Sequence, residues 1–170
     1  MNDKFILDAA CGGRCFWFDK HHPNTIYIDN EPRAKGISKF KPEFCCEPDM
    51  VMDFTNMTFP DKAFKLVVWD PPHLFNLGET SEMRKKYGVL RKDTWRYDLK
   101  KGFAECWRVL DDLGVLIFKW NEESIKIGEV LELFGEKPLF GHPTSKHGQT
   151  KWVCFMKIPA SAPPKQKEER

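Results

Sequence analysis

Short apolar segments that run up to an acidic residue recur along the first half of the chain. They occupy residues 5–10, 25–28, 50–52 and 64–69. Runs of this length, bounded by turn-forming residues, are typical of strands that are buried on both faces of a parallel sheet. The acidic residues that accompany these four strands are Asp8, Asp29, Asp53 and Asp70.

The second half of the chain adds helical periodicity. Apolar side chains recur at helical spacings over 97–110, and a turn at 111–114 leads into a fifth apolar run at 114–120. A second helix is expected over 124–134, with Ser124 as its N-cap and Gly135 as its stop. Two last strands, at 137–140 and 151–158, are close enough in sequence to pair antiparallel at one sheet edge. The predicted fold is an open α/β sheet, mostly parallel, with an antiparallel edge hairpin and helices on both faces.

Length and composition restrict this fold to one domain of ordinary globular type. The chain has 170 residues, 41% of them hydrophobic and 31% charged, which argues against collagen, a coiled coil and wholesale disorder. We expect a single domain over 1–158 and a disordered tail over 159–170, where proline and charged residues dominate. This length leaves no room for a large target-recognition domain.

Charge and hydropathy bear on where the protein works. No segment approaches the roughly 20 apolar residues of a membrane span, and the N-terminus lacks the pattern of a signal peptide, so we expect a soluble, cytoplasmic protein without a membrane partner. The net charge is only +2, so a nucleic-acid partner would have to be met by a local basic patch. The six cysteines form no C-x-x-C pair, and we expect reduced thiols and no metal site, with Cys45 and Cys46 a minor alternative.

The acids at the strand ends predict a ligand site. Ligands of open α/β sheets bind at the carboxyl ends of the strands, where these acids lie. Asp29 follows Asp8 by 21 residues, the spacing at which an acid on the second strand reaches the hydroxyl pair of a ribose. A nucleoside is therefore indicated, although an acid at this place is also common as a turn former or helix cap.

The glycine turn after the first strand discriminates between nucleoside cofactors. Residues 11–16 carry Gly12 and Gly13 but lack the G-x-G-x-x-G pattern that binds a pyrophosphate, and the chain has no P-loop. An NAD-dependent dehydrogenase is therefore disfavoured. The turn suits a nucleoside that carries an amino acid, whose ammonium group Asp8 would hold while the glycines let the backbone approach closely.

This arrangement resembles the class I S-adenosylmethionine (SAM)-dependent methyltransferases, over residues 4–158. The segment 8–14 matches the family's acid-x-Gly-x-Gly-x-Gly motif in part, with Ala10 at the first glycine and Arg14 at the last. The resemblance implies SAM as cofactor, with the glycine turn along its methionine part, Asp29 at its ribose, and Asp53 with Phe54 at its adenine. The cofactor-binding residues predicted in this way are Asp8, Ala10, Gly12, Gly13, Asp29, Asp53 and Phe54.

The tetrad Asp70-Pro71-Pro72-His73 resembles the D/N-P-P-aromatic motif of methyltransferases that modify planar amines, including phage and bacterial DNA adenine methyltransferases. Such an amine has its lone pair delocalised into the ring, and two fixed acceptors, the Asp70 carboxylate and the Pro71 carbonyl, would orient it for attack. The prolines keep the loop rigid. His73 stands where the family has an aromatic ring that stacks on the target base, and an imidazole is smaller and able to carry a charge near neutral pH. All four residues are predicted as catalytic.

A basic segment follows this tetrad. Residues 84–101 contain eight lysines and arginines against two aspartates, with Tyr87, Trp95 and Tyr97 interleaved. Cations with aromatic side chains fit phosphate attraction combined with stacking on unpaired bases, and the segment would close over the site as a lid. The alternative is a solvated helix face with its aromatic residues in the core. The predicted substrate-binding residues are Lys85, Lys86, Tyr87, Arg91, Lys92, Trp95 and, at the end of the fifth strand, Lys119.

Together these features predict a methyltransferase that transfers a methyl group from SAM to an exocyclic amine of a nucleobase, with adenine N6 in DNA or RNA as the first choice. A protein partner would supply target specificity. Two alternatives stay open: a SAM-dependent enzyme that acts on a protein amide or a small molecule, and a SAM- or nucleic-acid-binding module without turnover.

Overall fold

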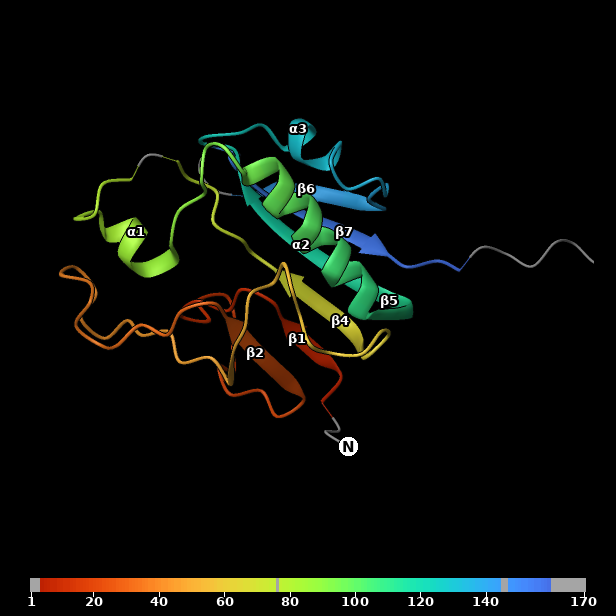
Figure 1. Ribbon diagram of the computed structural model, residues 1–170, viewed down its shortest axis with the longest axis horizontal. Helices are drawn as coiled ribbons and strands as arrows, with labels where there is room; N and C mark the ends of the chain where they lie inside the picture. The colour runs from red at the N-terminus through yellow and green to blue at the C-terminus, as the bar shows by residue number, and fades with distance from the viewer. Residues whose placement is uncertain (1–3, 76, 145–146, 160–170) are drawn as a thin grey trace, which may run out of the picture.

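A computed structural model describes residues 4–75, 77–144 and 147–159 of the chain (Figure 1). Its centre is a sheet of seven strands in the order β3-β2-β1-β4-β5-β7-β6. The strands are β1 (Ile6–Asp8), β2 (Thr25–Asp29), β3 (Met50–Val51), β4 (Phe64–Trp69), β5 (Leu110–Asn121), β6 (Phe140–Thr144) and β7 (Thr150–Met156). Strands β1 to β5 pair in parallel, and β7 pairs antiparallel with both β5 and β6. The predicted fold class, a mostly parallel α/β sheet with an antiparallel edge hairpin, is confirmed.

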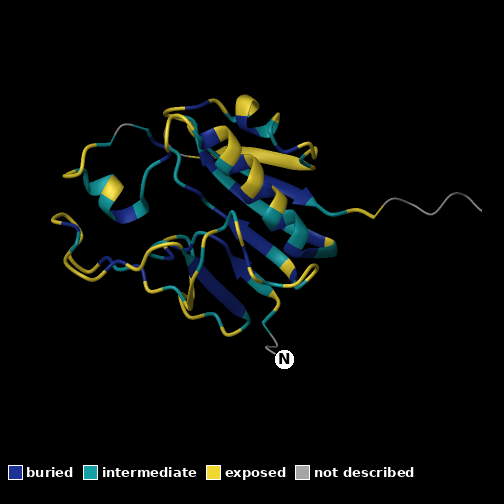
Figure 2. Cartoon of the chain, viewed as in Figure 1, coloured by how far each residue is buried: buried dark blue, intermediate teal, exposed yellow. Residues whose placement is uncertain are grey.

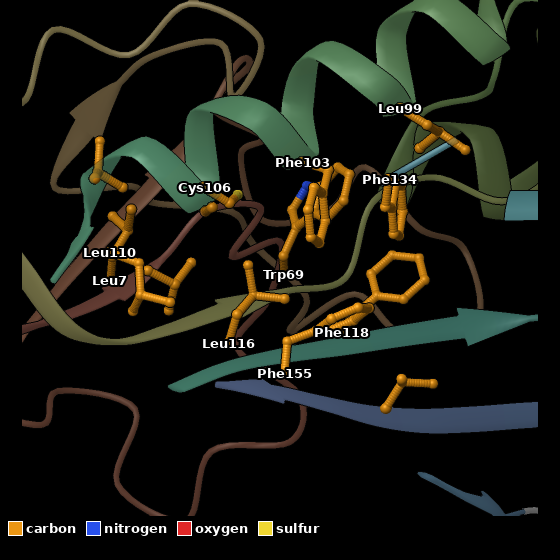
Figure 3. Close-up of a cluster of buried hydrophobic side chains, with 14 of the residues drawn as sticks. Leu7, Trp69, Leu99, Phe103, Cys106, Leu110, Leu116, Phe118, Phe134 and Phe155 are labelled. Carbon is orange, nitrogen blue, oxygen red and sulfur yellow. The ribbon is translucent and has the colours of Figure 1, made fainter. Parts of the chain in front are cut away.

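Helix α2 (Trp95–Val109) covers one face of this sheet, against β4 and β5 (Figure 1). Its apolar stripe, which includes Leu99, Phe103 and Cys106, forms one buried cluster with residues of β1, β2, β4, β5 and β7 (Figure 3). The short helix α3 (Ile127–Leu131) and the turn after it join the same core, where the Phe103 and Phe134 rings stack with centroids 4.2 Å apart. Burial of this aromatic cluster stabilises the fold.

The opposite face of the sheet has no helix among the residues that the structure describes. Instead, the irregular segment 9–24 covers β2, where Arg14 lies 3.8 Å above the ring of Tyr27 and Trp17 meets the same ring edge-on. The expectation of helices on both faces is therefore wrong for this face. The segment 9–24 combines two adjacent glycines with a run of polar and aromatic residues, and it has no apolar stripe at helical spacing.

Several element boundaries differ from those predicted. The turn expected at 111–114 is an irregularity inside β5, because the pairing with β4 shifts between Phe64 and Leu66 and the strand continues from Leu110. Helix α3 is shorter than the predicted 124–134, and the carboxylate of Glu122, rather than Ser124, accepts the backbone N–H of Ile127 at 3.0 Å. Strand β6 lies after the predicted 137–140, which contributes only its last residue.

Helix α1 (Glu82–Tyr87) was not predicted. Ser81 caps its start and Gly88, with φ of 75°, ends it. It lies beside the sheet rather than on it, at the left of Figure 1. The tail predicted over 159–170 lies outside the described residues from position 160 on, and within the described part no helix has the length and apolar character of a membrane span.

Gly102 lies where α2 closely approaches Phe54 and Trp69. A Cβ atom there would lie 2.6 Å from Phe54 and 2.7 Å from Trp69, whereas at Gly128 of α3 it would meet nothing within 4 Å. We expect Gly102→Ala to lower the free energy of unfolding by about 1–3 kcal/mol through overpacking. Gly128→Ala should be neutral or stabilising by up to about 1 kcal/mol, as expected for alanine in an open helix position. Urea denaturation of both variants tests this, and equal effects would contradict it.

Candidate active site

The carboxyl ends of β1, β4 and β5 border a cavity of about 390 Å³. The glycine turn lines one side of it, the 70–73 loop and Lys119 line another, and Tyr87 of α1 closes it. A smaller hollow of about 50 Å³ continues it toward β2, since both share Ala10, Gly12, Asp70, Pro72 and Tyr87. The structure thus brings the predicted glycine turn and the predicted catalytic tetrad to one site.

Both glycines of the turn are required by their surroundings. Gly12 has a φ of +46°, and its backbone N–H donates to Asp29 Oδ2 at 3.0 Å. A Cβ atom on Gly13 would lie 2.5 Å from the ring of Phe44. Any larger residue at either position would strain the backbone or displace Phe44.

Arg14 occupies the position of the last glycine in the resembled motif, and it keeps the positive φ that glycine would have, at 52°. Its side chain is buried and donates to the carbonyl oxygens of Lys20 at 2.6 Å and Glu47 at 2.7 Å, and to Asp49 at 3.3 Å. These charge-assisted bonds offset the left-handed backbone, which costs roughly 1–2 kcal/mol in a residue with a Cβ atom. Arg14 therefore shapes the turn without lining the main cavity.

Asp29 is the last residue of β2, as predicted. It lines the smaller hollow. Besides the Gly12 bond, its Oδ1 accepts from the buried guanidinium of Arg33 at 3.1 Å. The neighbouring Asn30 lines the same hollow and was not predicted, although its position directly after a strand-end acid was an available signal. Phe54 also lines this hollow, edge-on to Trp69.

Two predicted cofactor residues lie away from both cavities. Asp53 is exposed, and its Oδ1 accepts the backbone N–H of Thr55 at 2.7 Å, as in an Asx turn. Asp8 is fully buried, and its carboxyl group accepts from the indole of Trp17 at 2.7 Å and from the Ala10 N–H at 3.3 Å. Burial raises the pKa of Asp8 to about 7. Asp8 thus stabilises the glycine turn through its bond to Ala10 and does not face either cavity.

Asp70 and Lys119 meet across the ends of the neighbouring parallel strands β4 and β5. The Lys119 ammonium group donates to Asp70 Oδ2, and both residues line the main cavity together with Pro71 and Pro72. Burial raises the pKa of the Asp70 carboxyl group, while the charge and hydrogen bond of Lys119 oppose this rise. Lys119 also lies 5.6 Å from the Phe16 ring centroid and 5.8 Å from that of Trp152.

His73 lines the cavity next to this pair, and its ring meets Trp120 edge-on at 6.2 Å. Burial, with repulsion from Lys119, lowers the pKa of His73 to about 4. The imidazole is therefore neutral at pH 7, and the charge near neutral pH that the sequence allowed does not arise.

The predicted substrate-binding residues separate into two groups. Tyr87 and Lys119 line the cavity. Trp95 is buried in the core against Phe75, so its ring is not free to stack on a base, and Lys86 is also buried. Lys85 pairs with Glu82 at 3.5 Å within α1. Arg91 and Lys92 are exposed and lie away from the cavity lining.

Of the basic segment that was predicted to close over the site as a lid, only Tyr87 and Gly88 line the cavity, and residues 95–101 belong to α2. The Tyr87 hydroxyl lies 3.7 Å from Cys15 Sγ, and the Leu90 N–H donates to the Leu74 carbonyl at 2.9 Å. The apolar part of the cavity lining was not predicted. It consists of Cys15, Phe16, Leu74, Leu77 and Met83. Only Cys15 and Phe16, directly after the glycine turn, had a positional signal in the sequence.

One group of potential metal ligands lies among the described residues: single ligand atoms of Cys11, Cys46 and Asp29 lie within 4.8 Å of one another. Both oxygens of Asp29 already accept hydrogen bonds from Gly12 and Arg33. A hydrogen bond with Cys46, together with burial, raises the pKa of the Cys11 thiol, which disfavours the thiolate that binds metals. The group is therefore a poor donor set for a metal ion.

No protein-family model matches the sequence, and no curated protein sequence matches it. Solved structures do share its fold. A TehB-like SAM-dependent methyltransferase from Corynebacterium glutamicum is 18% identical, with a TM-score of 0.54 over 92% of this chain and 82% of that one. The N-methyltransferase NodS from Bradyrhizobium japonicum is 13% identical, with a TM-score of 0.55 over 91% and 85%. A geranyl diphosphate methyltransferase, in complex with GPP and sinefungin, is 9% identical, with a TM-score of 0.55 over 92% and 73%. The chain thus has the fold of the class I SAM-dependent methyltransferases.

The buried Asp8 predicts a pH dependence of stability. In the unfolded chain the carboxyl group of Asp8 has its usual pKa of 3.8, whereas in the folded chain its pKa is about 7. The free energy of unfolding should therefore fall as the pH rises through this window and level off above it, by an amount on the order of 4 kcal/mol. Asp8→Asn should remove this part of the fall. Denaturation between about pH 4 and pH 8 measures it, and an unchanged slope in the variant would rule out Asp8 as its source.

Proposed function

We propose that the protein is a SAM-dependent methyltransferase whose acceptor is a planar amine. The observation that carries the proposal is the pair of adjoining cavities, which share five lining residues and bring the glycine turn, Asp29 and the 70–73 loop to one place. A glycine turn beside a ribose-binding acid suits a nucleoside cofactor, and the Asp-Pro-Pro loop supplies fixed acceptors for an amine.

The residues present fit SAM. Asp29 and Asn30 would hold the ribose, and Phe54 would lie along the adenine, since all three line the hollow that continues the main cavity. Gly12 and Gly13 leave room for the methionine part. SAM supplies the electrophilic methyl group when it is bound. Asp8 supports this site indirectly, through its bond to Ala10, rather than by holding the ammonium group.

The acceptor end centres on Asp70. Lys119 is paired with this carboxyl group and opposes the rise that burial causes in its pKa, which favours the carboxylate form that accepts an N–H hydrogen of the amine. The Pro71 carbonyl is the second acceptor of the proposal. Two acceptors fixed by prolines hold the nitrogen in line with the methyl group and draw it toward tetrahedral geometry. The neutral His73 lies beside this position as a small planar contact.

A nucleobase is our first choice of acceptor, with adenine N6 foremost. The supporting observation is the set of exposed cations on α1 and α2 and in the loop between them. They are Arg84, Arg91, Lys92, Arg96, Lys100 and Lys101. Exposed cations on these elements suit the phosphate groups of a nucleic acid whose base enters the cavity.

A small molecule or a protein amide is the second candidate, and a different observation favours it. The lining of the acceptor end is mostly apolar and includes Phe16, Leu77 and Met83. Two of the proteins with this fold are named as an N-methyltransferase and as a geranyl diphosphate methyltransferase. A compact apolar amine would fill such a chamber without any contact to the exposed cations.

Methyl transfer from isotopically labelled SAM tests both candidates. The acceptors are duplex DNA, single-stranded DNA, RNA, protein and small amines from a cell extract, each analysed by mass spectrometry after digestion. We expect label in a nucleobase amine, and Asp70→Ala should lower the rate by at least about 100-fold because it removes one fixed acceptor. SAM binding should persist in this variant.

Asp112→Ala is the matched control, because Asp112 is a carboxylate at the opposite end of β5, in an exposed pair with Lys62. It should methylate at the wild-type rate. Label found only in small molecules or protein would favour the second candidate. SAM binding without label in any acceptor would favour a binding module, and absence of SAM binding would overturn the proposal.

The Lys119 pair predicts a pH dependence of the rate. Since Lys119 opposes the rise that burial causes in the pKa of Asp70, Lys119→Met should raise this pKa further. The acidic limb of the kcat/KM profile, which requires the Asp70 carboxylate, should then move to higher pH. Lys119→Arg should restore it, because an arginine keeps the cation. Unchanged profiles in both variants would show that the ionisation of Asp70 does not limit the rate.

A further inference from the structure

The loop between β2 and β3 carries an exposed tip. We call residues 34–43 the tip loop. The Gly36 N–H donates to the Pro42 carbonyl at 2.8 Å and the Lys41 N–H to Ser38 Oγ at 3.1 Å, so the tip is closed by its own hydrogen bonds. Gly36 has a φ of 86°, which lets the chain turn at this closure.

The tip loop is fastened to α1. The buried hydroxyl of Ser38 donates to Glu82 Oε2 at 2.7 Å, and the Lys39 N–H donates to the same oxygen at 3.0 Å. Figure 1 shows the loop reaching away from the sheet beneath α1. The tip loop is thus bonded to the helix whose last residue, Tyr87, lines the candidate active site.

The outer side of this loop combines an aromatic ring with cations. The Phe40 side chain is 83% exposed. It stands between Lys39 and Lys41, and Lys35 is exposed on the same loop, whose colour in Figure 2 is largely that of exposed residues. Residues 32–42 contain no acidic residue. In the part of the chain that the structure describes, no carboxylate forms an ion pair with any of these three lysines.

We propose that the tip loop binds single-stranded nucleic acid, with Phe40 stacked on an unpaired base and its neighbouring lysines on phosphates. A large ring exposed to water gains from covering by another flat surface, and bases offer one whatever their identity. The lysines supply the attraction to phosphate. The hydrogen bonds that close the loop reduce the ordering cost on binding.

An unpaired strand is favoured over a duplex because the bases of a duplex are already stacked on one another. This inference deepens the proposed function by naming the form of the substrate, and it rests on that function for its catalytic meaning. Binding by the tip loop needs neither SAM nor turnover, so the two proposals can fail separately.

The test is fluorescence anisotropy with a labelled single-stranded oligonucleotide of mixed sequence, without SAM. Phe40→Ala should weaken binding by about 10-fold, the typical loss of one stacked base, while Phe40→Trp should retain it. Phe140→Ala is the matched control, because Phe140 is 68% exposed on β6 at the far edge of the sheet, and it should bind as the wild type does. The double variant Lys39→Glu and Lys41→Glu should weaken binding and reduce its salt dependence.

Thermal unfolding of each variant verifies that the fold is intact. Equal affinities of Phe40→Ala and Phe140→Ala would overturn the proposal, as would duplex binding as tight as single-strand binding. Attachment to phosphatidylserine vesicles that depends on Phe40, without binding of the oligonucleotide, would assign the tip to a membrane surface instead. Binding that depends on Phe40 in a protein that transfers no methyl group would support the tip-loop proposal and leave the proposed function unsupported.

Discussion

Two buried arginines organise the half of the molecule that lacks helices. The segments 9–24 and 30–49 lie where a doubly wound sheet would have helices, and their backbone groups still need partners. Arg14 bonds carbonyl oxygens of both segments, and Arg33 binds Asp29 and the Glu31 carbonyl. Each planar guanidinium group joins several points at once, as a lysine could not. The position of the glycine turn, and thus of the candidate site, depends on these contacts.

The site brings three carboxyl groups together, and each is kept from repelling the others in a different way. Asp29 is paired with Arg33, Asp70 with Lys119, and Asp8 holds its proton to near neutral pH because it is buried. Like charges so close in a poorly solvated place could not all persist without partners. As a result, Asp8 has a structural role, whereas Asp29 and Asp70 line the smaller hollow.

Strands β1, β2, β4 and β5 were predictable because short apolar runs bounded by turns have few other structures open to them. The same applies to the acids that follow β2 and β4, since the ends of parallel strands meet at one edge. Strand β3, predicted as a buried strand, is exposed, and β6 is exposed and lies mostly outside its predicted run. The direction of a side chain was less accessible. Trp95 begins a helix, and its side chain is buried in the core. The carboxyl group of Asp8 is buried and accepts a hydrogen bond from Trp17. Both orientations depend on the tertiary packing around these side chains. Arg33 carried no local signal either, because its role arises only once β2 and the glycine turn are in place.

The packing of α2 on the sheet also influences the geometry of the candidate active site. At Gly102 the backbone of α2 touches both Phe54, on the wall of the smaller hollow, and Trp69, the residue before Asp70. A single anchor point therefore spaces the proposed adenine wall from the proposed amine acceptor. Displacement at a saturated carbon tolerates little error in the line from nucleophile to leaving group. Because Gly102 has no side chain, α2 can approach both residues, and this close approach sets the distance between the proposed adenine wall and the proposed amine acceptor.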